Sequence, residues 1–275
     1  MGRSLLFFGI VVCIALPSWS QQRPLRTDDA ELLEVGKIRT ELGVEFLHNQ
    51  SYSLSGLEGD LTRLGVTAFH VGVGEYAEFQ ISGVIQDFLS VSNRTTAVIP
   101  PSFDGNSTHD FGDLVLGTKL KLARESGRRP AFAFKFAVEL PNAKHDSGLG
   151  TDQTEFYASI LLSKRIAKAR ILGNVGLAIL GNPVVIGRQA DVLTYGLAAL
   201  LPLKSRINLV AEINGRKGPN PQRVGNEDQS QMRLGVQLLA GGLRWDMGGV
   251  AGFKKYDPDS GLAVGITYVF KAFHK

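Results

Sequence analysis

The chain has 275 residues, of which 30 are Lys or Arg and 26 are Asp or Glu, giving a formal net charge of +4. This small basic excess is scattered along the chain and forms no basic tract, so we expect no nucleic-acid partner. The single cysteine, Cys13, lies close to the N-terminus, so the rest of the chain can form no disulfide bond.

The first twenty residues have the pattern of a secretory signal peptide. Arg3 precedes an apolar run from Leu5 to Leu16, and Ser18 and Ser20 supply small residues at the expected cleavage site. The run is shorter than the ~20 apolar residues that a transmembrane helix needs. We therefore predict a signal peptide over 1–20, with an uncleaved membrane anchor as the alternative.

Residues 21–36 form the next unit. The stretch from Thr27 to Leu33, with Asp28 and Asp29 near its start, could form a short helix. We assign 21–36 to an N-terminal periplasmic segment and leave open whether it plugs a pore.

From Ile38 onward, apolar and polar residues alternate with a period of two, which places the two sets on opposite faces of β-strands. Most of the alternating segments are about as long as a tilted strand that crosses a bilayer. We predict twelve strands, at 37–47, 61–73, 77–86, 112–122, 131–140, 152–163, 169–180, 191–201, 206–214, 231–239, 243–253 and 261–270.

The connections between these segments alternate in length. Long polar loops follow the odd-numbered segments, at 48–60, 87–111, 141–151, 181–190, 215–230 and 254–260, and mostly tight turns follow the even-numbered ones. An even strand count with long loops on one side and short turns on the other is typical of transmembrane barrels. A soluble β-sandwich, the alternative, has no reason to sort its loops by side.

We therefore predict an all-β protein, an antiparallel transmembrane β-barrel of about 12 strands over 37–270 with a C-terminal tail at 271–275. Its location would be the outer membrane of a Gram-negative bacterium, with the lipid bilayer as a partner. Outside the predicted signal peptide, no stretch has the apolar length of a transmembrane helix.

One face of each predicted strand carries almost no charge, as a face in contact with lipid requires. In the ninth segment, for example, Ile207, Leu209 and Ile213 alternate with polar residues. The residues that we expect to point into the lumen balance in sign, which argues against strong selection of anions or cations. They are Arg39, Glu41, Glu45, Glu78, Asp113, Lys119, Lys121, Lys135, Glu139, Arg170, Arg206, Glu212, Arg233, Arg244 and Asp246. The alternative is that these charges pair and fill a narrow barrel.

The last segment has apolar residues at every second position and an aromatic residue near its end. This resembles the terminal-strand signature that the insertion machinery of the outer membrane recognises, so we expect that machinery as a partner. The residues on this face are Leu262, Val264, Ile266, Tyr268 and Phe270.

Several motifs in order resemble one family of outer-membrane proteins, associated with the meta-pathway of phenol degradation and often called transporters. They are Gly-Asp-Leu-Val-Leu-Gly-Thr-Lys at 112–119, Phe-Ala-Val-Glu-Leu-Pro at 136–141, Gly-Leu-Gly-Thr-Asp at 148–152, Gly-Asn-Val-Gly at 173–176, Leu-Val-Ala-Glu-Ile-Asn-Gly at 209–215 and Gly-Ile-Thr-Tyr-Val-Phe at 265–270. The resemblance implies an outer-membrane barrel that takes up aromatic or other hydrophobic compounds.

The sequence offers little that points to catalysis or to metal binding. The five histidines are widely separated, and we expect no metal or cofactor. His145 and Ser147 resemble the His-x-Ser of an outer-membrane phospholipase, but we expect no acid to orient the imidazole. Asp146 and Asp152 are too few oxygen ligands for Ca²⁺.

We expect a protein without enzymatic activity, built for the passage or uptake of small molecules. The alternatives are a structural or adhesive barrel that uses the loop at 87–111, and a lipid hydrolase that uses His145 and Ser147.

Overall fold

The computed structural model describes residues 23–185, 187–219, 224 and 227–272. The predicted signal peptide and most of the predicted tail lie outside the described residues, so both stay predictions. Among the residues described, no helix has the length and the apolar composition needed to span a membrane. The one helix in these ranges is a single 3₁₀ turn, η1 (His145–Ser147).

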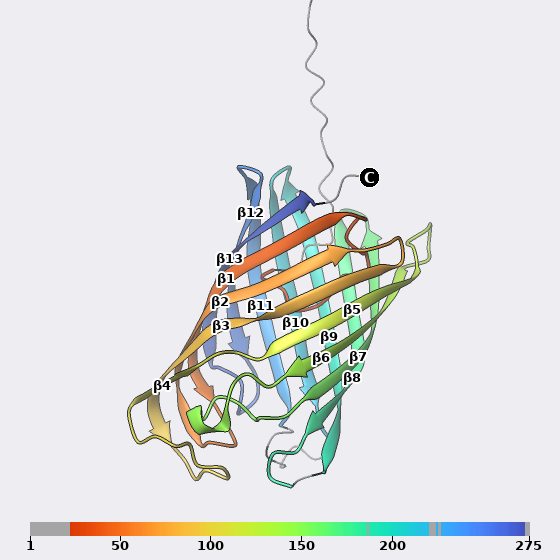
Figure 1. Ribbon diagram of the computed structural model, residues 1–275. Helices are drawn as coiled ribbons and strands as arrows, with labels where there is room; N and C mark the ends of the chain where they lie inside the picture. The colour runs from red at the N-terminus through yellow and green to blue at the C-terminus, as the bar shows by residue number, and fades with distance from the viewer. Residues whose placement is uncertain (1–22, 186, 220–223, 225–226, 273–275) are drawn as a thin grey trace, which may run out of the picture.

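Thirteen antiparallel strands make up most of the described chain (Figure 1). They are β1 (Lys37–Ser51), β2 (Leu57–Gly72), β3 (Ala77–Arg94), β4 (Ser107–Asp110), β5 (Leu114–Ala123), β6 (Ala131–Leu140), β7 (Glu155–Ile166), β8 (Ala169–Gly181), β9 (Gln189–Lys204), β10 (Ile207–Lys217), β11 (Gln229–Ala240), β12 (Leu243–Gly252) and β13 (Ser260–Lys271).

Twelve of these strands close into a ring, which confirms the predicted all-β barrel. Each strand pairs with its neighbours in the chain, and β1 pairs with β13 from Lys37 opposite Lys271 to His48 opposite Ser260. Closure matters in a membrane because every backbone N–H and C=O group there needs an internal partner. Both ends of the barrel chain lie beside the short turns, and the β3–β4 hairpin extends from the opposite end (Figure 1).

The predicted loop at 87–111 is partly β-structure, which corrects that boundary. Strand β3 continues to Arg94, and β4 pairs with it at Asp87–Asp110 through Ser90–Ser107. The reason is a buried cluster at this end of the barrel, in which Leu89 packs with Leu57 and Leu61. Burying these leucines extends the β2–β3 hairpin beyond the predicted strand ends.

The wall has two chemically different faces. Side chains that point outward are mostly large and apolar, such as Phe136, Leu209 and Leu234, which are 45%, 43% and 53% exposed. Side chains that point inward include many charged groups that are buried, such as Glu212 at 4%. This is the arrangement of a barrel surrounded by lipid, with its polar groups held inside.

Candidate functional site

The lumen collects most of the charged residues that the alternation assigns to it. Buried inside the barrel are Arg39, Glu41, Glu45, Glu78, Lys119, Arg170, Glu212, Arg233, Arg244 and Asp246. Asp113, Lys121, Lys135 and Glu139 are half-buried. His70 of β2 is also buried inside the barrel, and its Nδ1 lies 3.1 Å from the Oε1 atom of the Glu78 carboxylate.

Arg206 is the exception, and its predicted place in the lumen is wrong. Strand β9 ends at Lys204 and β10 begins at Ile207, so Ser205 and Arg206 form the tight turn between them. The Arg206 side chain is therefore exposed at the rim of the barrel. A two-residue turn at the end of a hairpin takes its residues out of the alternation of the strands.

The described part of the N-terminal segment, residues 23–36, lies against the inside of the wall, the position that the sequence left open. The Glu212 carboxylate of β10 accepts the backbone N–H groups of Arg26 and Thr27, each with an N–O distance of 2.8 Å. Arg170 of β8 binds the Asp29 carboxylate through Nε at 2.6 Å and Nη2 at 2.7 Å. We call residues 23–35 the plug.

Other strands hold the plug from further around the ring. Glu78 of β3 accepts the backbone N–H of Leu33 at 2.6 Å, and Lys119 of β5 donates to the carbonyls of Asp29 and Glu31 at 3.1 and 2.9 Å. On the side of β11 and β12, Gln237 donates to the Arg23 carbonyl at 2.7 Å. The plug thus spans the lumen between strands that lie far apart in the sheet.

These contacts explain why the short helix that residues 27–33 could form is absent from the structure. A helix would turn its backbone N–H and C=O groups toward one another along the chain. Here the backbone groups of Thr27, Asp29 and Leu33 bind charged side chains of the wall instead. Binding to the wall satisfies the same groups and pairs the buried charges of the lumen at once.

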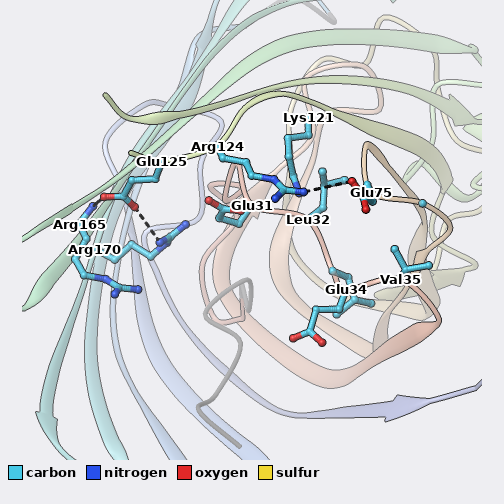
Figure 2. A pocket seen from close by; sticks show the side chains of 12 residues that line it. Glu31, Leu32, Glu34, Val35, Glu75, Lys121, Arg124, Glu125, Arg165 and Arg170 are labelled. Atoms are coloured by element: carbon cyan, nitrogen blue, oxygen red, sulfur yellow. Dashed lines mark hydrogen bonds and ion pairs between the residues drawn. The ribbon is translucent and has the colours of Figure 1, made fainter. Parts of the chain in front are cut away.

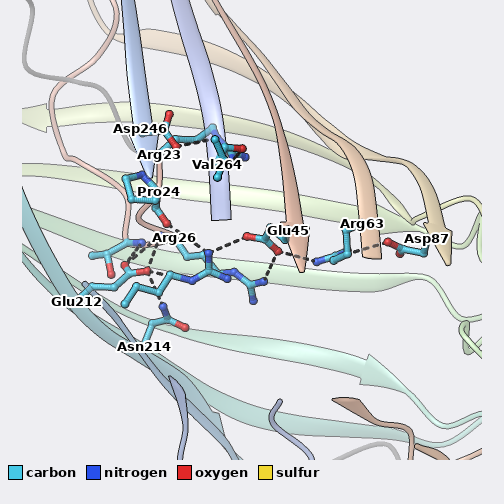
Figure 3. A network of polar contacts seen from close by, with 12 residues as sticks. Arg23, Pro24, Arg26, Glu45, Arg63, Asp87, Glu212, Asn214, Asp246 and Val264 are labelled. Atoms are coloured by element: carbon cyan, nitrogen blue, oxygen red, sulfur yellow. Dashed lines mark hydrogen bonds and ion pairs between the residues drawn. The ribbon is translucent and has the colours of Figure 1, made fainter. Parts of the chain in front are cut away.

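A row of ion pairs continues across the lumen beside the plug (Figure 3). Glu45 of β1 binds Arg233 of β11 at 2.7 Å and lies 3.4 Å from Arg26 of the plug. Arg63 of β2 lies 3.7 Å from Glu45 and 3.1 Å from Asp87 of β3, so it connects the two carboxylates. Because each buried charge has a partner of opposite sign, the row links four strands and the plug without an isolated buried ion.

Two cavities lie along the plug. One has a volume of about 660 Å³ and is lined by Arg26, Glu45, Arg63, Asp87 and Glu139, on the side of the long loops. The other has a volume of about 700 Å³ and lies on the side of the short turns. It is lined by plug residues from Glu31 to Val35 and by the side chains that Figure 2 shows around them. The plug lines both cavities and lies between them.

Glycines on the inner face of the wall make room for the plug. A Cβ atom at Gly265 would lie 2.5 Å from Arg23 Nε, and one at Gly43 would lie 2.1 Å from Arg23 Nη2. A Cβ at Gly72 would meet the Glu34 carbonyl oxygen at 2.2 Å. Such close approach is a reason for glycine inside a strand, and it is the sequence signal that could have revealed the plug.

The string around His145 is not arranged for nucleophilic catalysis. Asp152 hydrogen-bonds His145 Nδ1, so an acid does orient the imidazole, which corrects the expectation that none does. That hydrogen bond raises the pKa of His145. Ser147 Oγ donates to the Lys144 carbonyl at 2.7 Å, while His145 Nε2 faces Asp146 at 3.3 Å. Within the described ranges, no three His, Cys, Asp or Glu side chains form a metal site.

Comparisons with known proteins agree with the fold. No family model and no curated protein sequence matches the chain. Among solved structures, an outer membrane channel from Pseudomonas putida F1 has a TM-score of 0.60 at 16% identity, covering 88% of this chain and 98% of the channel. The translocator domain of the autotransporter NalP from Neisseria meningitidis has a TM-score of 0.51 at 13% identity, covering 85% and 88%.

The closed ring of strands and its apolar outer face define the class of this protein. It is a β-barrel of the bacterial outer membrane, in contact with the lipid bilayer. The resemblance to the family linked to phenol degradation stays a prediction, because identities this low show the fold alone.

Proposed function

We propose that the protein is a channel of the outer membrane for small solutes, in which residues 23–35 restrict passage. The observation that carries the proposal is the position of the plug between two cavities of about 660 and 700 Å³ in one closed barrel. Displacing the plug, wholly or in part, would join these cavities into a path from the long loops to the short turns.

The cavity on the side of the long loops has a lining that favours polar solutes as the first class to test. Arg26 and Arg63 face it together with Glu45, Asp87 and Glu139, so both signs of charge are present. A lining of this kind can replace the hydration of a small polar or zwitterionic molecule and gives little preference for one sign. Aromatic or hydrophobic solutes, which the family resemblance implies, form the second class to test.

The test compares the intact protein with a variant that lacks residues 23–35, both reconstituted in planar bilayers and in liposomes. We expect the deletion to raise single-channel conductance and to speed liposome swelling in small sugars and amino acids, because it removes the barrier between the cavities. Swelling in solutions of small aromatic acids tests the second class.

Deleting residues 95–106, a loop of similar length outside the plug, is the matched control and should leave conductance unchanged. Heat-dependent migration on gels checks that each variant has closed its barrel. If the folded protein conducts nothing with or without residues 23–35, the channel proposal is wrong.

A further inference from the structure

Three neighbouring turns at the periplasmic end share a pattern. Strands β5 to β10 follow one another around the wall, and the turns join β5 to β6, β7 to β8 and β9 to β10. Each of these turns begins beside the last lipid-facing apolar residue of the preceding strand, namely Leu122, Ile166 and Leu203. These three side chains mark where the apolar band ends in this part of the ring.

Basic residues follow directly after these apolar ones. Over 123–130, 166–169 and 204–207 the sequence has one acid, Glu125, which is half-buried and binds Lys164 at 3.0 Å. The basic residues of the same stretches are all exposed, and we call them the basic sector: Arg124, Arg128, Arg129, Lys168, Lys204 and Arg206.

The other two turns of this rim lack this charge, and the chain ends there carry Lys271 and Lys37, of which Lys37 pairs with Glu34. The turn between β11 and β12 consists of Gly241 and Gly242 and has no charged residue. The turn between β2 and β3 has one acid, Glu75, which lies 3.5 Å from Arg124 of the basic sector. Among the turns, the positive charge is therefore gathered in the three that join β5 to β6, β7 to β8 and β9 to β10, and it is not a general feature of the turns.

We propose that the basic sector binds the headgroups of anionic phospholipids in the periplasmic leaflet of the outer membrane. Leu122, Ile166 and Leu203 lie among the acyl chains, so the bases of the turns that follow them, which begin at Arg124, Lys168 and Lys204, lie at the depth of the phosphates. Arg and Lys side chains attract anionic headgroups at this depth and donate charged hydrogen bonds to phosphate oxygens. A soluble acidic protein would not require bases so close to the apolar band.

Quenching of tryptophan fluorescence by brominated lipids can compare which lipids lie next to two points on the rim. Trp245, 47% exposed near the periplasmic start of β12, reports on the rim beside the uncharged turn between β11 and β12. Leu203→Trp combined with Trp245→Phe reports on the basic sector. Both proteins carry Trp19→Phe, so each has one tryptophan. Each is folded into mixed phosphatidylethanolamine and phosphatidylglycerol bilayers in which one lipid is brominated.

We expect brominated phosphatidylglycerol to quench the Leu203→Trp reporter about three times as strongly as brominated phosphatidylethanolamine does. Trp245 should be quenched equally by the two lipids. Adding Lys204→Gln and Arg206→Gln should abolish the preference. Lys254→Gln with Lys255→Gln removes the same charge from exposed positions at the other end of the barrel and should leave it intact.

Two results would overturn the proposal. Equal quenching by both lipids at the Leu203→Trp reporter would mean that the basic sector does not bind anionic lipid, leaving an acidic periplasmic protein as its partner. A preference that survives Lys204→Gln with Arg206→Gln would mean that these bases do not cause it.

Discussion

The contact between Asp29 and Arg170 shows how single residues hold the plug. Both side chains are buried, and the guanidinium binds the carboxylate through two nitrogens. Removing one member of such a pair leaves the other charge buried without compensation, which typically costs about 3 to 5 kcal/mol. Most of that cost weakens the docking of the plug and not the fold of the barrel, because backbone hydrogen bonds between the strands hold the wall separately.

Asp29→Asn should therefore release the plug in part and raise the conductance of reconstituted protein without unfolding the barrel. Single-channel recording measures the effect, and gel migration before boiling checks the fold. Glu34→Gln is the matched control, since the exposed Glu34 carboxylate pairs with the half-buried Lys37 side chain at 2.8 Å and not with a buried charge of the wall. Equal conductance of Asp29→Asn and the intact protein would contradict the assignment of Asp29 as an anchor.

The pair of His145 and Asp152 gives the loop after β6 a dependence on pH. The hydrogen bond to Asp152 raises the pKa of His145 above its ordinary value in the unfolded chain. The pair therefore stabilises the loop fully below that ordinary value, and the stabilisation is lost as the pH rises through the raised pKa. NMR titration should show Asp152→Asn lowering the His145 pKa more than Asp146→Asn does. An equal or larger shift with Asp146→Asn would refute the assignment.

At the scale of elements, β13 closes the ring between β1 and β12. Its predicted signature residues all point outward, and Tyr268 and Phe270 stack at the periplasmic end with ring centroids 5.6 Å apart. If the insertion machinery reads this strand, Phe270→Ala should lower the fraction of barrel assembled in cells. Phe253→Ala, at an exposed phenylalanine just after β12, should not. Comparable assembly of the two variants would argue against recognition through Phe270.

Strands could be predicted from the sequence because the alternation records directly which face meets lipid. The β3–β4 extension was missed because it depends on Leu89 packing against Leu57 and Leu61, which are distant in the chain until the strands pair. The plug stayed an open alternative for a similar reason. Its backbone groups and charges bind partners such as Glu212, which is 185 residues from Thr27, and Arg170, which is 141 residues from Asp29, and no local sequence pattern describes contacts across a closed ring.

At the scale of the whole molecule, the apolar outer face makes the cost of a charged substitution depend on how deep in the membrane the residue lies. Leu197 and Leu203 both point outward from β9, and each is 57% exposed. Leu203 lies at the periplasmic end of the apolar band. Six residues of strand, at about 3.3 Å each and a tilt of about 40°, place Leu197 close to the middle of that band.

Leu197→Arg should therefore destabilise the barrel by about 2 to 4 kcal/mol, and Leu203→Arg by about 1 kcal/mol or less, because the cost of a charge on the lipid face falls toward the interface. Reversible unfolding in guanidinium chloride, with the protein in lipid vesicles, measures both free energies of unfolding. The two variants make the same chemical change on the same strand, so only depth separates them. Equal destabilisation would mean that this face does not cross the hydrocarbon, and the placement of the ring in a bilayer would have to be abandoned.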